Sequence, residues 1–473
     1  MALACLLAVG GGRVARAADP TRLPTALEEG NPWDVFFSVG WRYENHLAKI
    51  KREYEQPGRT TNQIEIVRDL KYARTRNILN LRADFGILWD LSLFIEAPLV
   101  LNDDRSLSFD QDGPNCTYTG PTANCVDMGN STTLNDMASA PPNPNAPTVL
   151  PGALTPGTMG GWGLNATGSA PRLYTTGTKV FEGPTRSGLE SLNFGLNWAL
   201  LNQRKDDTKP TWTVGFEARL QVTGTQGFSR AAPQANTEVG LGYHVARWQS
   251  FVSKRFRYVD PYVGFWYELP VIHSSTAFPD YTQPGALGAA SGTGQKNVSP
   301  MQTAGTVFGF EAVAYSKERE KQYVGIDFRG HIDAHFEGRG WSELWEVLAC
   351  SKDDPDPFKS SLCYPPADLF GLPSLPGTTD IENYATAGGE LGVTVQVGEY
   401  VHFRASFGAD HMQSHTITFT DAGKDKNSDG MVDPTSKDEY NPLHRQQVDL
   451  VGRRYRVDDS TLYFVNVAGT LMF

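Results

Sequence analysis

Pairs of charged residues two positions apart recur along the chain, and in a β-strand this spacing places both side chains on one face. Most of these pairs join an acid with a base. They are Arg42 with Glu44, Arg82 with Asp84, Glu217 with Arg219, Asp327 with Arg329, and His402 with Arg404. Two interpretations stay open. The charges either select solutes, as rings of charge do in pores, or fill a narrow interior by neutralising one another.

Other charged residues occupy the same alternate positions of neighbouring segments, and the positions between them are apolar. We therefore expect one polar face that lines an interior and one apolar face that contacts lipid. The residues expected to line the interior are Arg42, Arg82, Asp84, Glu96, Glu217, Arg219, Asp327, Arg329, Glu390 and Arg404, with Glu268 and Glu311 in the same register.

A stretch near the C-terminal end matches the first nine positions of an EF-hand calcium loop. Oxygen donors stand at positions 1, 3 and 5, a glycine at 6 and an aspartate at 9, whereas position 12 is Ser436 instead of glutamate. A calcium ion that stiffens the loop and a solvated acidic turn both agree with this pattern. The candidate ligands are Asp425, Asn427, Asp429, Met431 and Asp433.

His331, Asp333 and His335 alternate, so all three are expected on one side of a strand. Imidazole and carboxylate are good ligands for divalent metals. A polar interior without metal explains the same three residues, and the sequence leaves both interpretations open.

Four cysteines form two local pairs, Cys116 with Cys125 and Cys350 with Cys363, inside polar, proline-rich stretches. In an exported chain this arrangement predicts two disulfides that close loops. Metal ligation is the competing interpretation, but no C-x-x-C spacing supports it.

The sequence also contains no G-x-S-x-G, H-E-x-x-H or phosphate-binding Gly-Lys motif, so we expect no enzymatic activity.

The segments that must position these residues alternate with a period of two, which indicates extended strands. In the first of them, Val35, Phe37 and Val39 share the apolar face. About twelve such segments occur. They lie near residues 34–44, 79–85, 91–97, 191–200, 212–222, 239–248, 261–271, 306–315, 324–336, 390–397, 401–409 and 461–473.

Short and long connections alternate between these segments, which is typical of outer-membrane barrels with short periplasmic turns and long outer loops. No apolar run reaches the roughly 18 residues of a spanning helix. The predicted fold is therefore all-β, a transmembrane antiparallel up-and-down barrel of about 12 strands that occupies residues 34–473. Its long outer loops are expected at 102–187, 273–302, 337–383 and 420–460, and apolar spacing in 340–348 predicts a short helix in the third.

The two ends of the chain agree with an exported barrel. The final strand, 461–473, ends on Phe473 and resembles the C-terminal signature of bacterial outer-membrane barrels. At the other end, an apolar run followed by Ala15-Arg16-Ala17 predicts a signal peptide at 1–17 and a periplasmic segment at 18–33. The net charge of −11 argues against a nucleic-acid partner.

Three stretches, 81–101, 188–224 and 259–272, resemble the outer-membrane barrels associated with meta-pathway phenol degradation, relatives of the long-chain fatty-acid transporter superfamily. The shared features are the FGI-turn-LSLFIEAPL hairpin and the GL..LNFGL strand with its charged turn. The resemblance implies an outer-membrane channel for the passive passage of small molecules, hydrophobic compounds among them. A different hypothesis is a structural or interaction barrel. Its outer loops, closed by the two predicted disulfides, would then bind a partner protein, polysaccharide or surface.

Overall fold

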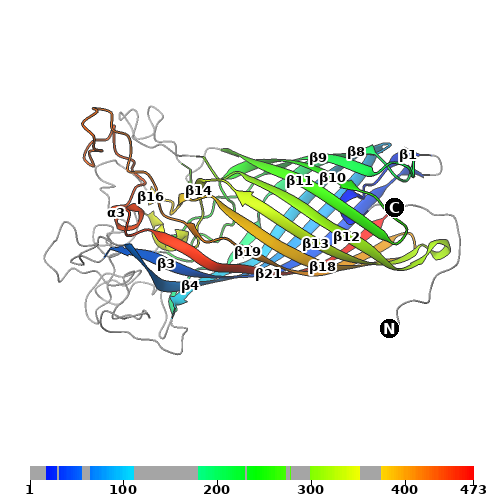
Figure 1. The fold of residues 1–473 in the computed structure, drawn as a ribbon, viewed down its shortest axis with the longest axis horizontal. Helices are drawn as coiled ribbons and strands as arrows, with labels where there is room; N and C mark the ends of the chain where they lie inside the picture. Colours follow the sequence, from blue (N-terminus) through cyan, green and yellow to red (C-terminus); the bar gives the residue numbers. More distant parts are fainter. Residues whose placement is uncertain are drawn as a thin grey trace.

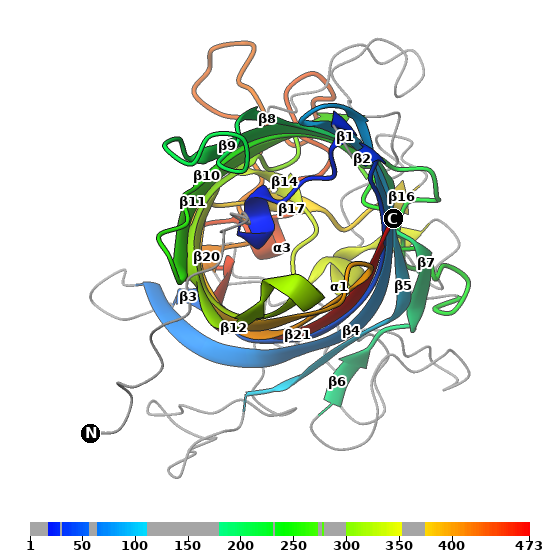
Figure 2. The ribbon, with the colours of Figure 1, turned by 90° about the vertical axis from the view of Figure 1, so that its right-hand side faces the viewer.

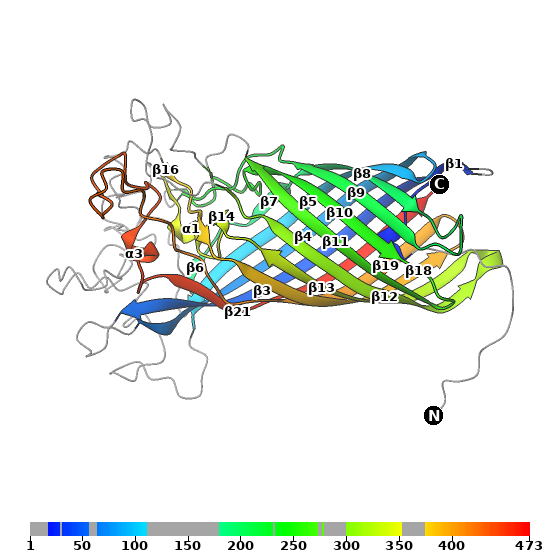
Figure 3. The same ribbon diagram turned by 45° about the horizontal axis from the view of Figure 1, so that its top comes forward.

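One closed antiparallel sheet dominates the computed structural model, which describes residues 18–28, 31–55, 64–110, 179–229, 232–272, 277–278, 299–351 and 374–473 (Figure 1). Within these ranges, twelve strands form a barrel and lie oblique to its axis (Figures 1 and 3). The barrel strands are β3 (Val35–Glu55), β4 (Ile64–Leu88), β5 (Leu91–Phe109), β8 (Leu192–Leu201), β9 (Thr211–Leu220), β10 (Tyr243–Ser253), β11 (Val259–Ile272), β12 (Thr303–Lys317), β13 (Gln322–His335), β18 (Tyr384–Val397), β19 (Val401–Met412) and β21 (Tyr455–Met472). This confirms the predicted fold class.

The last strand closes the sheet against the first. β21 pairs antiparallel with β3 along nearly its whole length, and the backbone groups of Val35 and Phe473 exchange two hydrogen bonds of 3.0 Å each. In hydrocarbon an unpaired backbone N–H or C=O costs several kcal/mol, so a membrane sheet must have no free edge. The aromatic C-terminus therefore completes the barrel.

The outer face of the barrel is apolar. Large side chains at alternate strand positions are 37–57% exposed, among them Phe37, Val39, Leu81, Phe265 and Phe403. The predicted charged residues occupy the positions between these, on the opposite face. A closed barrel with an oily exterior and a charged interior is the architecture of a bacterial outer-membrane protein, and the outer membrane is its location.

Several strands extend further toward the long-loop end than their apolar pattern predicts. β5 continues through residues 102–109, which are mostly polar, and the short strands β6 (Lys179–Glu182) and β7 (Arg186–Leu189) pair with it. β21 begins at Tyr455, inside the predicted loop 420–460. The predicted outward apolar pattern ends there because apolar side chains of the extended wall, such as Leu107 and Phe109, pack in the core with the cap instead of facing lipid. The 102–187 boundary was therefore wrong at both ends.

A cap of short elements fills the long-loop end of the barrel (Figure 2). It contains β14 (Gly338–Gly340), α1 (Trp345–Leu348), β15 (Cys350–Ser351), β16 (Ser374–Leu375), β17 (Thr379–Ile381), β20 (His415–Thr416) and α3 (Gln446–Asp449). The main hydrophobic core lies here, where Trp345, Val347 and Leu348 pack with Ile50, Leu70 and other residues of the wall. The short helix predicted within 340–348 is thus confirmed, and it packs inward.

The N-terminal segment enters the opposite end of the barrel. The 3-10 turn η1 (Asp19–Thr21) lies within the ring of strands, and the hairpin of β1 (Ala26–Glu28) and β2 (Asn31–Trp33) follows it near the rim (Figure 2). A second 3-10 turn, η2 (Glu318–Glu320), makes one of the short connections at this end. The first part of the predicted periplasmic segment therefore lies inside the barrel end, and its hairpin lies at the rim.

Two predictions lie outside the described residues. The signal peptide, 1–17, is one of them. The other is the pair of disulfides, because Cys116, Cys125 and Cys363 and the side chain of Cys350 are not described.

The apolar outer belt can be tested at Phe265, which is 57% exposed midway along β11. We predict that Phe265→Arg destabilises the barrel by about 2–4 kcal/mol, the cost of a cation facing mid-bilayer lipid. Val245→Arg is the matched control, because Val245 borders a cavity on the inner face. Urea-dependent refolding into liposomes gives both values, and equal losses would contradict the assignment of faces.

Candidate functional site

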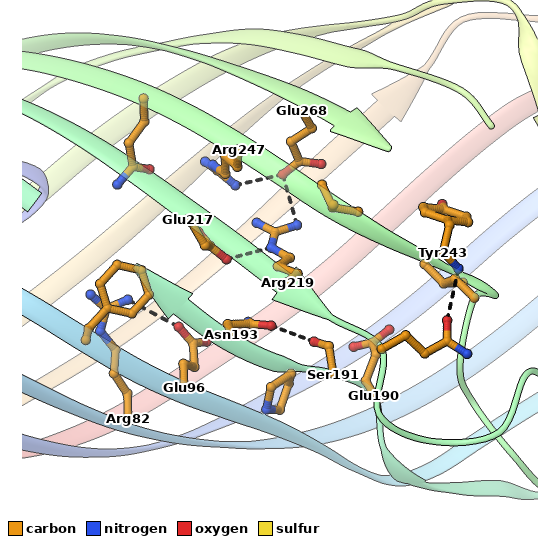
Figure 4. A pocket seen from close by; sticks show the side chains of 16 residues that line it. Arg82, Glu96, Glu190, Ser191, Asn193, Glu217, Arg219, Tyr243, Arg247 and Glu268 are labelled. Atoms are coloured by element: carbon orange, nitrogen blue, oxygen red, sulfur yellow. Dashed lines mark hydrogen bonds and ion pairs between the residues drawn. The ribbon is translucent and has the colours of Figure 1, made fainter. Parts of the chain in front are cut away.

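A cavity of about 490 Å³ lies against the inner wall of the barrel, where β4, β5 and β8–β11 meet (Figure 4). Charged and polar side chains together make up most of its lining, and apolar groups border part of it. The lining residues are Arg82, Phe94, Glu96, Pro98, Glu190, Ser191, Asn193, Glu217, Arg219, Gln221, Leu241, Tyr243, Val245, Arg247, Gln249 and Glu268. Figure 4 shows the charged groups pointing toward one another across neighbouring strands.

Ion pairs connect these strands in sequence. Arg82 binds Asp84 at 2.7 Å and reaches Glu96 on the next strand at 3.2 Å. Arg219 binds Glu217 at 2.6 Å and Glu268 at 2.9 Å. The same oxygen of Glu268 accepts a hydrogen bond of 3.0 Å from Arg247. The carboxylates and guanidinium groups thus alternate along the wall.

Acids outnumber bases at this cavity, with four glutamates against three arginines. Each glutamate uses one carboxylate oxygen in the ion pairs of the described residues: Glu96 with Arg82, Glu190 with Arg76, Glu217 with Arg219, and Glu268 with Arg219 and Arg247. Within that part of the chain, the second oxygen of each accepts no side-chain hydrogen bond. The cavity therefore presents carboxylate oxygens that no described side chain occupies, beside arginine donors such as Nε of Arg247 that also have no partner there.

Aromatic rings fix the arginines in place. The Arg82 guanidinium lies 3.9 Å from the centre of the Phe94 ring, a cation–π contact that also orients the charge. Phe94 occupies space above Gly195, where an added Cβ atom would lie 2.3 Å from the ring. Glycine at this position is thus required for the ring to support Arg82. Arg247 lies 4.7 Å from the Trp266 ring in the same way.

The opposite wall carries a second network centred on Asp327, which is buried. One oxygen of Asp327 accepts hydrogen bonds from Arg329 at 3.1 Å and Arg404 at 2.7 Å, and the other accepts the Tyr262 hydroxyl at 2.7 Å. Arg404 also binds Glu390 at 3.0 Å. On β3, Arg42 pairs with Glu44 and lies 4.5 Å from the Phe464 ring.

The structure thus places all ten predicted interior residues in ion pairs on the inner face of the barrel. Their role as a pore lining stays a proposal. Arg247, Tyr243 and Glu190 were not predicted, although Arg247 precedes the outward-facing Trp248 and alternation alone would have placed it inside. Glu190 lies between the predicted loop, 102–187, and the predicted strand, 191–200, and no sequence signal indicates its place.

Buried charges also fasten the cap to the wall. Arg186, which has no exposed side-chain area, binds Glu346 of α1 at 2.8 Å, and its guanidinium lies 4.8 Å from the Trp345 ring. Within the cap itself, Arg339 of β14 binds Asp380 of β17 through two parallel hydrogen bonds of 3.0 and 3.1 Å. In the same cap, burial raises the pKa of Asp449 to about 6. The cap is thus held by polar contacts as well as by its apolar core.

His331 and His335 do not converge. His331 lies 3.1 Å from Asp410 and 3.9 Å from Asp333, whereas the His335 ring stacks on Tyr384 at 4.3 Å. Among the residues that the structure describes, no group of three or more His, Cys, Asp or Glu side chains is arranged to hold a metal ion. The polar-interior interpretation explains these histidines.

The residues of the predicted calcium loop form a turn stabilised by their own backbone. Asp425 accepts the N–H groups of Ser428 and Gly430 at 2.7 and 2.9 Å, and the buried Glu439 accepts those of Asn427 and Asp433 at 3.3 and 3.1 Å. These bonds agree with an acidic turn that needs no ion. Calcium binding through Asp425, Asn427, Asp429, Met431 and Asp433 stays a prediction.

No protein-family profile matches the chain, and no curated protein matches it. Solved structures to which it is similar include an outer-membrane channel from Pseudomonas putida F1, with 8% identity, a TM-score of 0.38, and coverage of 97% of this chain and 100% of that chain. A Pseudomonas aeruginosa FadL homologue has 9% identity, a TM-score of 0.31, and coverage of 94% and 90%. A mutant of the TodX monoaromatic hydrocarbon channel has 8% identity, a TM-score of 0.27, and coverage of 93% and 90%.

At these identities and scores, the assignment of the fold rests on the geometry of the barrel itself. Within the described ranges, no helix is long and apolar enough to cross a membrane.

The buried ion pair between Arg339 and Asp380 leads to a prediction about the stability of the cap. Arg339→Ala leaves the buried Asp380 without its partner, so we expect a loss of about 3–5 kcal/mol in cap stability. Lys205→Ala is the control, because its pair with Asp90 is exposed and is worth about 1 kcal/mol at most. Proteolysis of the cap in the folded protein measures the difference, and equal protease resistance would contradict the role of this pair.

Calcium binding is tested by calorimetric titration of the purified protein. The sequence pattern predicts heat on addition of Ca²⁺ to the wild type and none for Asp425→Ala, because Asp425 holds position 1 of the pattern. Asp206→Ala, in a short turn at the opposite end of the barrel, is the control. If the titration of the wild type produces no heat, only the interpretation as an acidic turn without calcium remains.

Proposed function

We propose that the chain is an outer-membrane channel through which small molecules pass passively along the charged lumen. The observation that supports this most is the 490 Å³ cavity on the inner wall, which residues of six neighbouring strands border and whose charged lining residues all form ion pairs. Each carboxylate at this cavity is ion-paired, and the second oxygen of Glu217 and of Glu268 is left to accept hydrogen bonds from a solute.

The lining defines the solutes that fit. Glu217 and Glu268 offer acceptor oxygens, while Phe94, Tyr243 and Val245 border the same cavity with apolar surface. Such a site favours small organic molecules that combine a hydrogen-bond donor or a positive charge with an apolar part. The apolar portion is compatible with the hydrophobic compounds that the sequence resemblance implies, and the excess of acids disfavours anions.

The second candidate is a structural or interaction barrel whose outer loops bind a protein, polysaccharide or surface. The observation that favours it is the well-packed cap, where residues such as Trp345 and Arg339 are almost completely buried. A rigid cap suits a binding platform as well as it suits a channel entrance. The two candidates differ in one property, which is whether solutes cross the wild-type barrel.

Planar-bilayer recording of the purified protein separates them. We expect discrete single-channel conductance with a preference for cations over anions, because acids exceed bases at the cavity. Glu217→Gln combined with Glu268→Gln should lower that preference, and Arg82→Ala should change the conductance. Glu399→Gln, on an exposed short turn, is the control and should change neither.

A wild-type barrel that is correctly folded but never conducts would exclude the channel and leave the interaction barrel. Conductance with a preference for anions would support the channel hypothesis but would contradict the proposed solutes, which carry a hydrogen-bond donor or a positive charge. Liposome swelling with small amines and small carboxylates extends the same comparison to organic solutes.

A further inference from the structure

The residues that follow the expected signal cleavage site are buried in the short-turn end of the barrel. Ala18 is 1% exposed, and Thr21 and Thr25 are each 2% exposed. Figure 2 shows this N-terminal coil, in blue, inside the ring of strands. A segment that merely connected a leader to the first strand would not need to be enclosed.

Specific contacts hold the segment in position. The Thr21 hydroxyl lies 2.7 Å from the Ser253 hydroxyl on β10. Asp34 accepts the backbone N–H of Thr25 at 2.9 Å. The Thr25 carbonyl lies so close to Gly86 that an added Cβ atom there would be 2.4 Å from its oxygen. The wall is thus shaped to receive this segment.

One acid of the wall faces the start of the segment. Asp260, on β11, is 2% exposed, and its carboxylate interacts with the backbone N–H of Ala18. Its second oxygen is buried and has no hydrogen-bond partner among the described residues. A buried carboxylate with an unsatisfied oxygen is costly, so the site lacks a donor.

The charges around Asp260 indicate which kind of donor is missing. Arg255 and Glu311 both act on Asp260, and the Tyr323 hydroxyl donates a hydrogen bond to Glu311. Among the described groups that act on Asp260, the acid Glu311 thus opposes the base Arg255. A positive charge directly beside Asp260 would neutralise its carboxylate and satisfy its free oxygen.

We propose that Ala18 is the first residue of the mature protein and that its α-ammonium group forms a buried ion pair with Asp260. The small-x-small sequence Ala15-Arg16-Ala17 directs cleavage to the Ala17–Ala18 bond. Hydrolysis consumes one water, leaves a carboxylate on Ala17 and releases an amine on Ala18, which takes up a proton. The new ammonium group supplies the missing positive charge.

Because of this ion pair, the binding of the N-terminal segment in the barrel end depends on cleavage of the signal peptide. Before cleavage Ala18 offers one neutral N–H, whereas afterwards it offers a charged group with three donors. Asp260 is in this scheme a positioning residue that fixes the segment in the barrel end. The inference stands independently of solute passage.

The first measurement is the mass of the N-terminal peptide of protein isolated from the outer membrane. We expect the chain to start at Ala18. Any other first residue would overturn the proposal, because only an ammonium on Ala18 is placed against Asp260.

The second measurement is the rate at which an amine-reactive reagent labels the α-amine of the folded protein near neutral pH. Only the neutral amine reacts, and an ion pair that raises its pKa by one unit slows labelling about tenfold. We expect Asp260→Asn to label about tenfold faster than the wild type. Asp206→Asn, an exposed acid on a short turn of the barrel, is the control and should match the wild type.

Equal rates in the wild type and Asp260→Asn would overturn the pairing. Heat-dependent migration on gels shows whether each variant is folded. Should Asp260→Asn fail to fold, a glycine inserted between Ala17 and Ala18 moves the ammonium group by about 3.8 Å and should raise the labelling rate in the same way. An unchanged rate in that variant would overturn the proposal equally.

Discussion

The structure depends on the pairing of every backbone group in a sheet that has no edge. Because lipid offers no hydrogen bonds, the strands satisfy one another around the full circle, and the contact between β21 and β3 completes it. Closure then fixes the two faces, since each strand turns alternate side chains outward and inward. The apolar belt, the charged lumen and the aromatic C-terminus all follow from this constraint.

A second constraint is that the many charged side chains inside the narrow barrel must neutralise one another. The arginines of the two lumen networks each contact at least one carboxylate, and several lie on aromatic rings that fix their direction. Small residues such as Gly195 make room for those rings. Both ends of the cylinder carry inserted chain, the cap at one end and the N-terminal segment at the other (Figure 2).

The sequence predicted the barrel well, because alternation over ten or more residues is a strong and purely local signal. All twelve strands and the inward charges follow from it. Prediction from sequence failed where no outward apolar alternation marks the structure. It missed the extension of β5 beyond Asn102, the position of Glu190 at the cavity, and the contact between Arg186 and Glu346 in the cap. It also gave no sign that residues 18–26 enter the barrel, because burial there comes from the shape of the wall rather than from any pattern in the segment.

The central claim is that one face of each strand meets water and the other meets lipid. Single cysteines placed along β9 test it in liposomes, with a charged thiol reagent and the wild type as background. Positions 213, 217 and 219 should react, whereas 214, 216 and 218 should not. Reaction at every position, or at none, would contradict a sealed barrel with a wet interior.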